Sequence, residues 1–151
     1  MRAMGLDVGD ARIGVALSDP LGIIASPLTI ITRKDGGSGI EAIVDIARQN
    51  EVGQIIVGLP LSMDGSVGKQ ADKVHAFTTE LCHCTEIPIE FRDERLSTKV
   101  AKRVVQKLRK TNRETRYDAA AAALILQDYL DDKCYTEGRQ NKLGDQIWPP
   151  D

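Results

Sequence analysis

The feature that most constrains this fold is an acid between two apolar runs near the start of the chain. Asp7 follows Ala3–Leu6 and precedes a Gly9-Asp10 pair, after which Ile13–Leu17 is again apolar. Two such runs around a glycine-containing turn predict an antiparallel pair of strands. Because an unpaired charge is costly to bury, Asp7 requires a partner, and we expect a metal ion or a phosphate bound through one. The turn itself is ordinary for a hairpin, so only Asp7 points to function.

The remaining patterns predict an α/β fold. A run rich in β-branched residues at 26–32 predicts a third strand, which continues the antiparallel meander of the first two. The uninterrupted Ile55-Ile56-Val57 run is typical of a strand that is buried on both faces of a parallel sheet. In chain order, we expect strands at 4–8, 12–18, 26–32, 54–58 and 87–91, and helices at 39–50, 68–81, 97–109 and 117–130. This order predicts a five-stranded mixed sheet, with three antiparallel meander strands, then two parallel strands, and helices on both faces.

Length and composition favour one domain without a membrane span. The chain has 151 residues, and we expect a folded domain at 1–135 and a polar tail at 136–151. Apolar residues make up 42% and aromatic residues 4%, so the core must be aliphatic. The longest apolar stretch, Ala119–Leu126, is too short to span a membrane, and the start of the chain lacks the apolar region of a signal peptide. We therefore expect a cytoplasmic protein.

The cysteines do not predict a disulfide framework. There are three, Cys82, Cys84 and Cys134, and an odd number fits a reducing compartment. Their spacing relative to His75 and His83 matches no common zinc pattern.

Acidic residues recur where strands or helices end. Asp7 ends the first strand, the Asp93-Glu94 pair follows the fifth, and Asp118 opens the last helix. Ligands of open parallel sheets bind outside the carboxyl ends of the strands, where we expect the first and fifth strands to be neighbours. The alanine run after Asp118 would let its helix lie close to the sheet, although a helix dipole alone also favours this acid. Clustered carboxylates repel unless a cation binds, and these oxygen ligands suit Mg²⁺ or Mn²⁺.

Positive charge is concentrated between residues 92 and 116. This segment carries ten Lys and Arg and three acids, whereas the rest of the chain has ten basic and nineteen acidic residues. Such segregation favours a polyanion site, although many basic helix faces serve solubility alone. Contacts to a phosphate backbone would read shape rather than sequence. The candidate phosphate contacts in this segment are Lys99, Lys102, Arg103, Lys107, Lys110, Arg113 and Arg116.

Several motifs occur in a fixed order along about residues 3–130, at 7–16, 18–20, 57–61, 63–65, 93–98 and 118–120. Together they resemble the YqgF/RuvX family, whose members are described as proposed pre-16S rRNA nucleases or Holliday-junction resolvase homologues. The resemblance implies an RNase H-like fold. It also implies that Asp7, one acid of Asp93-Glu94, and Asp118 form the catalytic, metal-binding set, with Glu94 preferred over Asp93.

The resemblance further implies that Arg12 and Lys69 contact phosphates. The chain departs from the family pattern at Asp10, where Thr or Ser is common, and at Ala121, where related resolvases carry a further acid. A complete four-acid site is therefore not expected. Asp10 is either a turn residue that faces solvent or a second acid that perturbs the metal site.

The leading functional hypothesis is a divalent-metal-dependent endonuclease that acts on structured RNA and processes the 5′ end of pre-16S rRNA. A close alternative is a Holliday-junction resolvase of branched DNA, which makes paired incisions and therefore needs a homodimer. A non-catalytic nucleic-acid-binding module is a further alternative. An actin-like phosphotransferase would need two lobes and a second Asp-x-Gly loop, which a chain of 151 residues does not supply.

Overall fold

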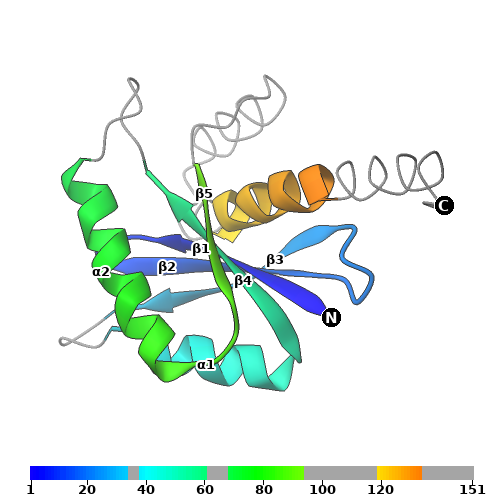
Figure 1. Ribbon diagram of the computed structural model, residues 1–151, viewed down its shortest axis with the longest axis horizontal. Coiled ribbons are helices and arrows are strands. Elements are labelled where there is room, and N and C mark those ends of the chain that lie inside the picture. Colours follow the sequence, from blue (N-terminus) through cyan, green and yellow to red (C-terminus); the bar gives the residue numbers. More distant parts are fainter. Residues whose placement is uncertain (34–37, 61–67, 94–118, 134–151) are drawn as a thin grey trace, which may run out of the picture.

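The computed structural model describes residues 1–33, 38–60, 68–93 and 119–133 of the chain. The last of these ranges is helical, and we name it the C-terminal helix. The other elements are β1 (Arg2–Val8), β2 (Arg12–Ser18), β3 (Ala25–Thr32), α1 (Ile40–Gln49), β4 (Val52–Leu59), α2 (Lys69–Cys84) and β5 (Ile89–Asp93). Their order is the predicted one (Figure 1). The helix predicted at 97–109 and the tail at 136–151 lie outside the described residues. None of the described helices is long and apolar enough to cross a membrane.

The five strands form one mixed sheet in the order β3-β2-β1-β4-β5. The first three strands are antiparallel neighbours, and β4 and β5 extend the sheet in parallel to β1, as predicted. The prediction that the first and fifth strands are neighbours was wrong, since β4 lies between them. Ile55, Ile56 and Val57 are fully buried, whereas no residue of β5 is fully buried. Burial on both faces therefore gives β4 the interior position.

Alternate residues of β1 face two different cores. Met4 and Leu6 pack with α1 and α2 on one face. Ala3 packs on the other face with Ile56 of β4 and with apolar residues of the C-terminal helix. In Figure 1 α1 and α2 lie together, and the gold-to-orange C-terminal helix lies apart from them. Helices therefore cover both faces of the sheet, as predicted.

The C-terminal helix lies directly against the backbone of β1 at Gly5. A Cβ atom on Gly5 would lie 2.8 Å from the carbonyl oxygen of Ala122 and 2.8 Å from the Cβ of Leu126. Leu130, farther along the helix, lines a pocket with Arg2 at the start of β1. The helix thus runs antiparallel to β1, from its carboxyl end toward its amino end (Figure 1). Small side chains permit the close approach that the alanine run predicted.

The connection between β2 and β3 is fixed by Asp19. Its carboxylate accepts hydrogen bonds from the backbone N–H groups of Ile23 at 2.7 Å and Ile24 at 2.9 Å. Gly22, at a φ of 71°, donates its N–H to the carbonyl oxygen of Asp19. The backbone hydrogen bonds, that of Ile24 first and that of Ile23 second, lower the pKa of Asp19 below its usual 3.8.

The edge strand β3 pairs irregularly with β2. Val15 pairs with Thr29 and Ala16 with Pro27, so β3 has one extra residue at this point. Pro27 has no backbone N–H to donate, and an extra residue bends a strand and increases its local twist. The edge strand β3 is therefore irregular and lacks one of the backbone N–H donors of a regular strand.

Candidate active site

The carboxyl ends of β1, β4 and β5 meet at one edge of the sheet. Asp7 is the next-to-last residue of β1 and is half-buried. Asp93 is the last residue of β5 and is paired in register with Leu59, the last residue of β4. Both acids therefore lie at the edge where the sequence placed them, two strands apart rather than on adjacent strands. Neighbouring strands are about 4.8 Å apart, so roughly 10 Å separates the two backbones.

Strand alternation places these two acids on opposite faces of the sheet. Asp7 follows Gly5 by two residues and shares its face, which is the face of the C-terminal helix. Asp93 follows Phe91 by two residues, and Phe91 and Leu59 both pack on the core of α1 and α2. Only Asp7 of this pair therefore faces the C-terminal helix.

Glycines surround Asp7 in the sheet. Gly14 is its partner on β2, and Gly5 precedes it on the same face. On β4, Gly58 follows Val57, the partner of Leu6. Glycine inside a strand often marks a place where a ligand approaches closely. At Gly5 the approaching group is the C-terminal helix itself, through Ala122 and Leu126. Gly14 and Gly58 place no side chain beside Asp7 on the two neighbouring strands.

The turn after Asp7 is held by two basic residues that sequence reasoning missed. Arg33 donates through Nη1 to the carbonyl oxygen of Gly9 at 2.8 Å, and its guanidinium lies 5.3 Å from the centre of the Phe77 ring. Lys73 of α2 contacts the Asp10 carboxylate at 3.3 Å, in a pair that is largely exposed. Asp10 thus has the geometry of a surface turn residue. No local sequence pattern signals either contact, because both join distant segments.

The predicted phosphate contacts fall in two groups. Arg12 opens β2 beside the turn, and Lys69 opens α2 one helical turn before Lys73, so both lie at the edge that carries Asp7. The other predicted site residues lie outside the described residues: Glu94, Lys99, Lys102, Arg103, Lys107, Lys110, Arg113, Arg116 and Asp118.

Arg92 of β5 forms an ion-pair network with the C-terminal helix, and this network was also missed. Its Nε donates to Asp128 at 2.9 Å and its Nη1 to Asp132 at 3.0 Å. Desolvation lowers the pKa of Arg92, but the hydrogen bonds and charges of the two carboxylates outweigh it, so the pKa is raised overall. The pairs are 36 and 40 residues apart in the chain, and a charged helix face gives no sequence signal for such a contact.

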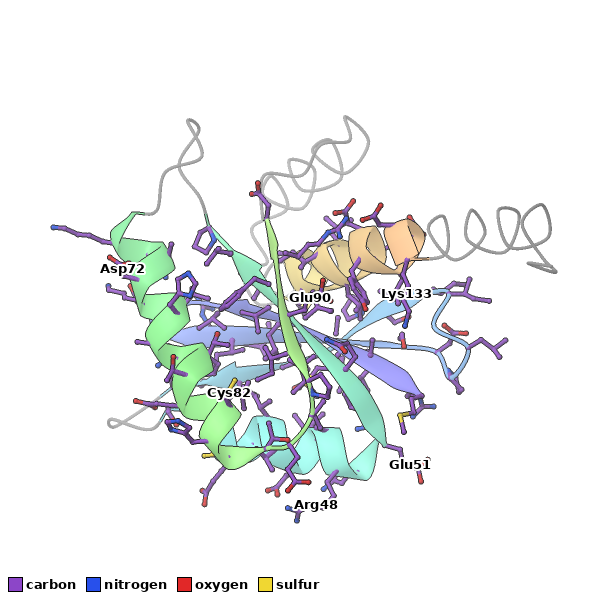
Figure 2. The ribbon with its side chains drawn as sticks, in the orientation of Figure 1. Arg48, Glu51, Asp72, Cys82, Glu90 and Lys133 are labelled. Atoms are coloured by element: carbon purple, nitrogen blue, oxygen red, sulfur yellow. The ribbon has the colours of Figure 1, made fainter. Side chains whose placement is uncertain are left out.

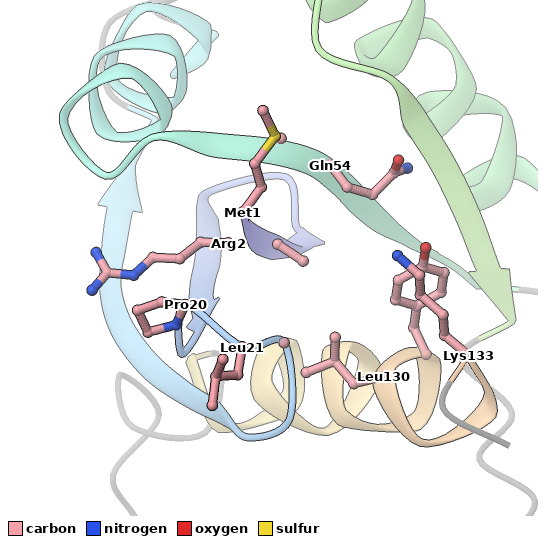
Figure 3. Close-up of a pocket in the computed structure, with 11 residues that line it drawn as sticks. Met1, Arg2, Pro20, Leu21, Gln54, Leu130 and Lys133 are labelled. Atoms are coloured by element: carbon pink, nitrogen blue, oxygen red, sulfur yellow. The ribbon is translucent and has the colours of Figure 1, made fainter. Parts of the chain in front are cut away.

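Other candidate sites are remote from Asp7. A pocket of about 340 Å³ lies at the amino ends of β1 and β4, between Arg2, Gln54 and Leu130 (Figure 3). This is the opposite edge of the sheet, so the pocket is separate from the acids. Cys82 and Cys84 are exposed on α2, and Figure 2 shows the position of Cys82. Within the described ranges, no group of three or more His, Cys, Asp or Glu residues could hold a metal ion.

A family model and several named relatives match most of this chain. The family model described as "RuvX: Holliday junction resolvase" matches residues 1–132. A protein of Dehalococcoides mccartyi is 48% identical over 125 residues, which cover 83% of this chain and 94% of the relative. A protein of Gloeobacter violaceus is 40% identical over 144 residues, which cover 95% and 92%. Both relatives are named "Putative pre-16S rRNA nuclease".

Two solved structures share the fold. Thermus thermophilus RuvC in complex with a Holliday junction substrate has a TM-score of 0.58 at 12% identity, with 89% of this chain and 96% of that chain covered. The Fowlpox virus resolvase with Holliday junction DNA has a TM-score of 0.55 at 12% identity, with 87% and 98% covered. These likenesses confirm the predicted RNase H-like fold.

Proposed function

Since this chain belongs to the RuvX family and is a nuclease that hydrolyses phosphodiester bonds, we propose that Mg²⁺ or Mn²⁺ bound beside Asp7 supports the reaction. The observation that carries the proposal is the position of Asp7, half-buried at the carboxyl-end edge, with Gly14 opposite it on β2 and Gly58 on the neighbouring strand β4. Carboxylate oxygens are the ligands that these hard ions prefer. Two such ions about 3.5–4 Å apart can activate a water and stabilise the leaving oxygen of a phosphodiester.

The second ligand of the proposed site is Glu94. Asp93 ends β5 on the face of α1 and α2, whereas Asp7 faces the C-terminal helix. Alternation continued by one residue would return Glu94 to the face of Arg92 and Asp7. This argument supports the preference for Glu94 that the family resemblance implied.

The third proposed ligand is Asp118, the residue before the described part of the C-terminal helix. That helix begins at the carboxyl end of β1, and its first described residue, Ala119, is buried. The helix then contacts Gly5 through Ala122. Because Asp118 directly precedes the first described turn of this helix, we propose that it lies at the same strand-end edge as Asp7.

The basic residues would hold the substrate while the acids hold the metal. Arg12 and Lys69 lie at the Asp7 edge, and we propose that they bind phosphates there. The basic segment between residues 99 and 116 would bind phosphates farther along the same backbone. Such contacts orient a strand without reading its bases.

Pre-16S rRNA is the proposed substrate because relatives at 40–48% identity are named "Putative pre-16S rRNA nuclease". We propose its 5′ end as the region that is processed. Branched DNA is the second candidate. The description of the family model and the likeness to junction-bound RuvC favour it, and it would need a homodimer for paired incisions.

The test compares Asp7→Asn with Asp10→Asn. Asp10 is three residues after Asp7 and belongs to a largely exposed ion pair with Lys73, so this control removes the same charge from the surface. Each variant and the parent are assayed with Mg²⁺, with Mn²⁺ and with EDTA, on a pre-16S rRNA fragment and on a four-way DNA junction. We expect Asp7→Asn to lose cleavage and keep nucleic-acid binding, and Asp10→Asn to cleave like the parent. Cleavage by Asp7→Asn at the parental rate would overturn the metal mechanism. Preference between the substrates, with the mass in solution, separates the two candidate functions.

A further inference from the structure

Arg92 joins the two elements that lead into the proposed acids Glu94 and Asp118. We propose that Arg92 is a positioning residue: by clamping β5 to the C-terminal helix, it fixes the spacing of these acids and thereby sets the metal affinity of the site. This inference rests on the proposed function. It assigns a role to an ion-pair network at which no nucleic acid or metal contact is proposed.

The network is built as a clamp rather than as a single surface pair. One guanidinium donates from Nε to Asp128 at 2.9 Å and from Nη1 to Asp132 at 3.0 Å. The side chains of Arg92 and Asp128 are only 25% and 32% exposed, so solvent screens this pair less than an open surface pair. Asp128 and Asp132 are four residues apart on the helix, where two like charges repel unless a cation lies between them. Arg92 therefore holds a specific stretch of the helix.

Arg92 lies close to the proposed metal ligands both in the sequence and in the sheet. Arg92 is two residues before Glu94 in the sequence, and it occupies the face of β5 that looks toward the C-terminal helix. Its register partner on β4 is Gly58, the residue after the partner of Leu6. Arg92 and Asp7 thus lie near the same row of the sheet, on the same face, with a glycine between them.

The geometry of the helix makes metal distances sensitive to the clamp. The helix touches β1 at Gly5 through Ala122. Along the axis, residue 119 lies about 4.5 Å before Ala122, and Asp128 lies about 9 Å beyond it. If the helix tilted by roughly 5° about this contact, residue 119 would move by about 0.4 Å, whereas metal–ligand distances vary by about 0.2 Å. Releasing Asp128 would therefore loosen the site at the other end of the helix.

The helix has a second attachment that provides a matched control. Gln127 accepts a hydrogen bond from the Ala25 N–H at 2.9 Å and donates one to the Ile23 carbonyl oxygen at 2.9 Å. This attachment joins the same helical turn to the β2–β3 connection instead of to β5. Loss of either attachment should destabilise helix packing, but only the loss of Arg92 should reach the strand that leads to Glu94.

The experiment measures Mn²⁺ binding to the full chain by the electron paramagnetic resonance signal of the free ion, without substrate. Cleavage is followed in parallel as a function of Mn²⁺ concentration, and the thermal midpoint is recorded. We expect Arg92→Gln to weaken Mn²⁺ binding about tenfold, the usual effect of removing a residue that orients metal ligands. Its cleavage rate at saturating Mn²⁺ should stay within a few-fold of the parent. Gln127→Ala should lower the thermal midpoint and weaken Mn²⁺ binding clearly less than Arg92→Gln does, because it frees the helix but leaves β5 in place.

Equal Mn²⁺ affinities for Arg92→Gln and Gln127→Ala would overturn the inference, since Arg92 would then be merely structural. Asp132→Asn, which removes the more exposed partner and leaves the Asp128 pair, should give a smaller shift in the same direction. If Arg92→Gln does not fold, Asp132→Asn replaces it as the test. An unchanged Mn²⁺ affinity of Asp132→Asn would then contradict the clamp. Asp7→Asn separates the two proposals: if it cleaves normally, the proposed function fails, and if only the Arg92 arm fails, the proposed function stands.

Discussion

Asp7 and Asp93 end parallel strands at the same edge of the sheet, yet they lie on opposite faces of it. Two acids at the carboxyl ends of strands in one sheet therefore need not share a metal site. A metal ion held by Asp7 on the face of the C-terminal helix would be shielded from Asp93 by the backbone of the sheet. This relationship supports Glu94 over Asp93 as the proposed metal ligand.

The first prediction concerns this choice between acids. Glu94→Gln should lose metal-dependent cleavage, because it removes a proposed ligand, whereas Asp93→Asn should cleave within a few-fold of the parent. The two variants remove one negative charge each from adjacent positions, so each controls for the other. The measurement is the initial cleavage rate at saturating Mn²⁺. The reverse order of the two rates would assign the ligand to Asp93.

A second prediction concerns the contact between the C-terminal helix and β1. Gly5→Ala should destabilise the protein by about 1–3 kcal/mol, because the new methyl group meets the Ala122 backbone and the Leu126 Cβ at 2.8 Å. For a chain of this size, the thermal midpoint should fall by roughly 3–10 °C. Gly53→Ala is the control, because the three atoms nearest to its methyl all belong to the side chain of Met1, which is 95% exposed and can move. Equal thermal midpoints for the two variants would contradict the close approach.

A third prediction concerns acid titration of the β2–β3 connection. The pKa of Asp19 is lowered because its carboxylate accepts backbone hydrogen bonds from Ile24 and Ile23. Its contribution to stability is therefore present above the usual pKa and is lost as the pH falls through the lower folded value. A carbon-detected NMR titration should give a midpoint below 3.8, and the amides of Ile23 and Ile24 should lose protection relative to their intrinsic exchange rates below that pH. In Asp19→Asn this acid-dependent change should vanish; a parental midpoint at or above 3.8 would refute the assignment.

A fourth prediction concerns the basic segment. Replacing Lys102, Arg103 and Lys107 by Gln should weaken nucleic-acid binding and reduce the slope of log K against log salt by about 2–3 on duplex DNA arms, as expected for three lost phosphate contacts. The measurement is fluorescence anisotropy at several salt concentrations, with EDTA present to prevent cleavage.

The matched control removes three positive charges at the opposite edge of the sheet. Arg2 and Lys133 line the pocket there, and Arg48 lies in the last turn of α1. The triple Gln variant at these positions should keep the parental salt slope. If both triple variants change the slope equally, binding follows net charge and not the basic segment.

Much of the fold could be predicted because its signals are local. Within the described residues, the apolar runs around Gly9 and the periodic helix patterns predicted elements within a few residues of those observed. The spatial order of strands is not local: β2 was correctly predicted as a neighbour of β1, but the fifth strand was wrongly predicted as the other one. The uninterrupted Ile55–Val57 run indicated burial on both faces, which fits an interior strand better than the half-exposed β5 does.

The candidate site divides in the same way. Asp7 could be found because a carboxylate at the end of an apolar run is unusual in any context. The face of Asp93 could not, because it depends on how far β5 continues, and the strand predicted to end at 91 extends to Asp93. The contacts of Arg92 and Arg33 join segments far apart in the chain, and their charges resemble an ordinary solvated surface until the helix and sheet are packed together.

The irregular outer strand has a consequence for how copies of this protein can associate. Because β3 carries Pro27 and an extra residue opposite β2, it is a poor template for adding a strand from another molecule. A dimer that joins two sheets edge to edge through β3 is therefore disfavoured. The same irregularity protects newly made chains from aggregating through this edge strand. If two copies cut a branched substrate together, side chains on other surfaces must bring them into register.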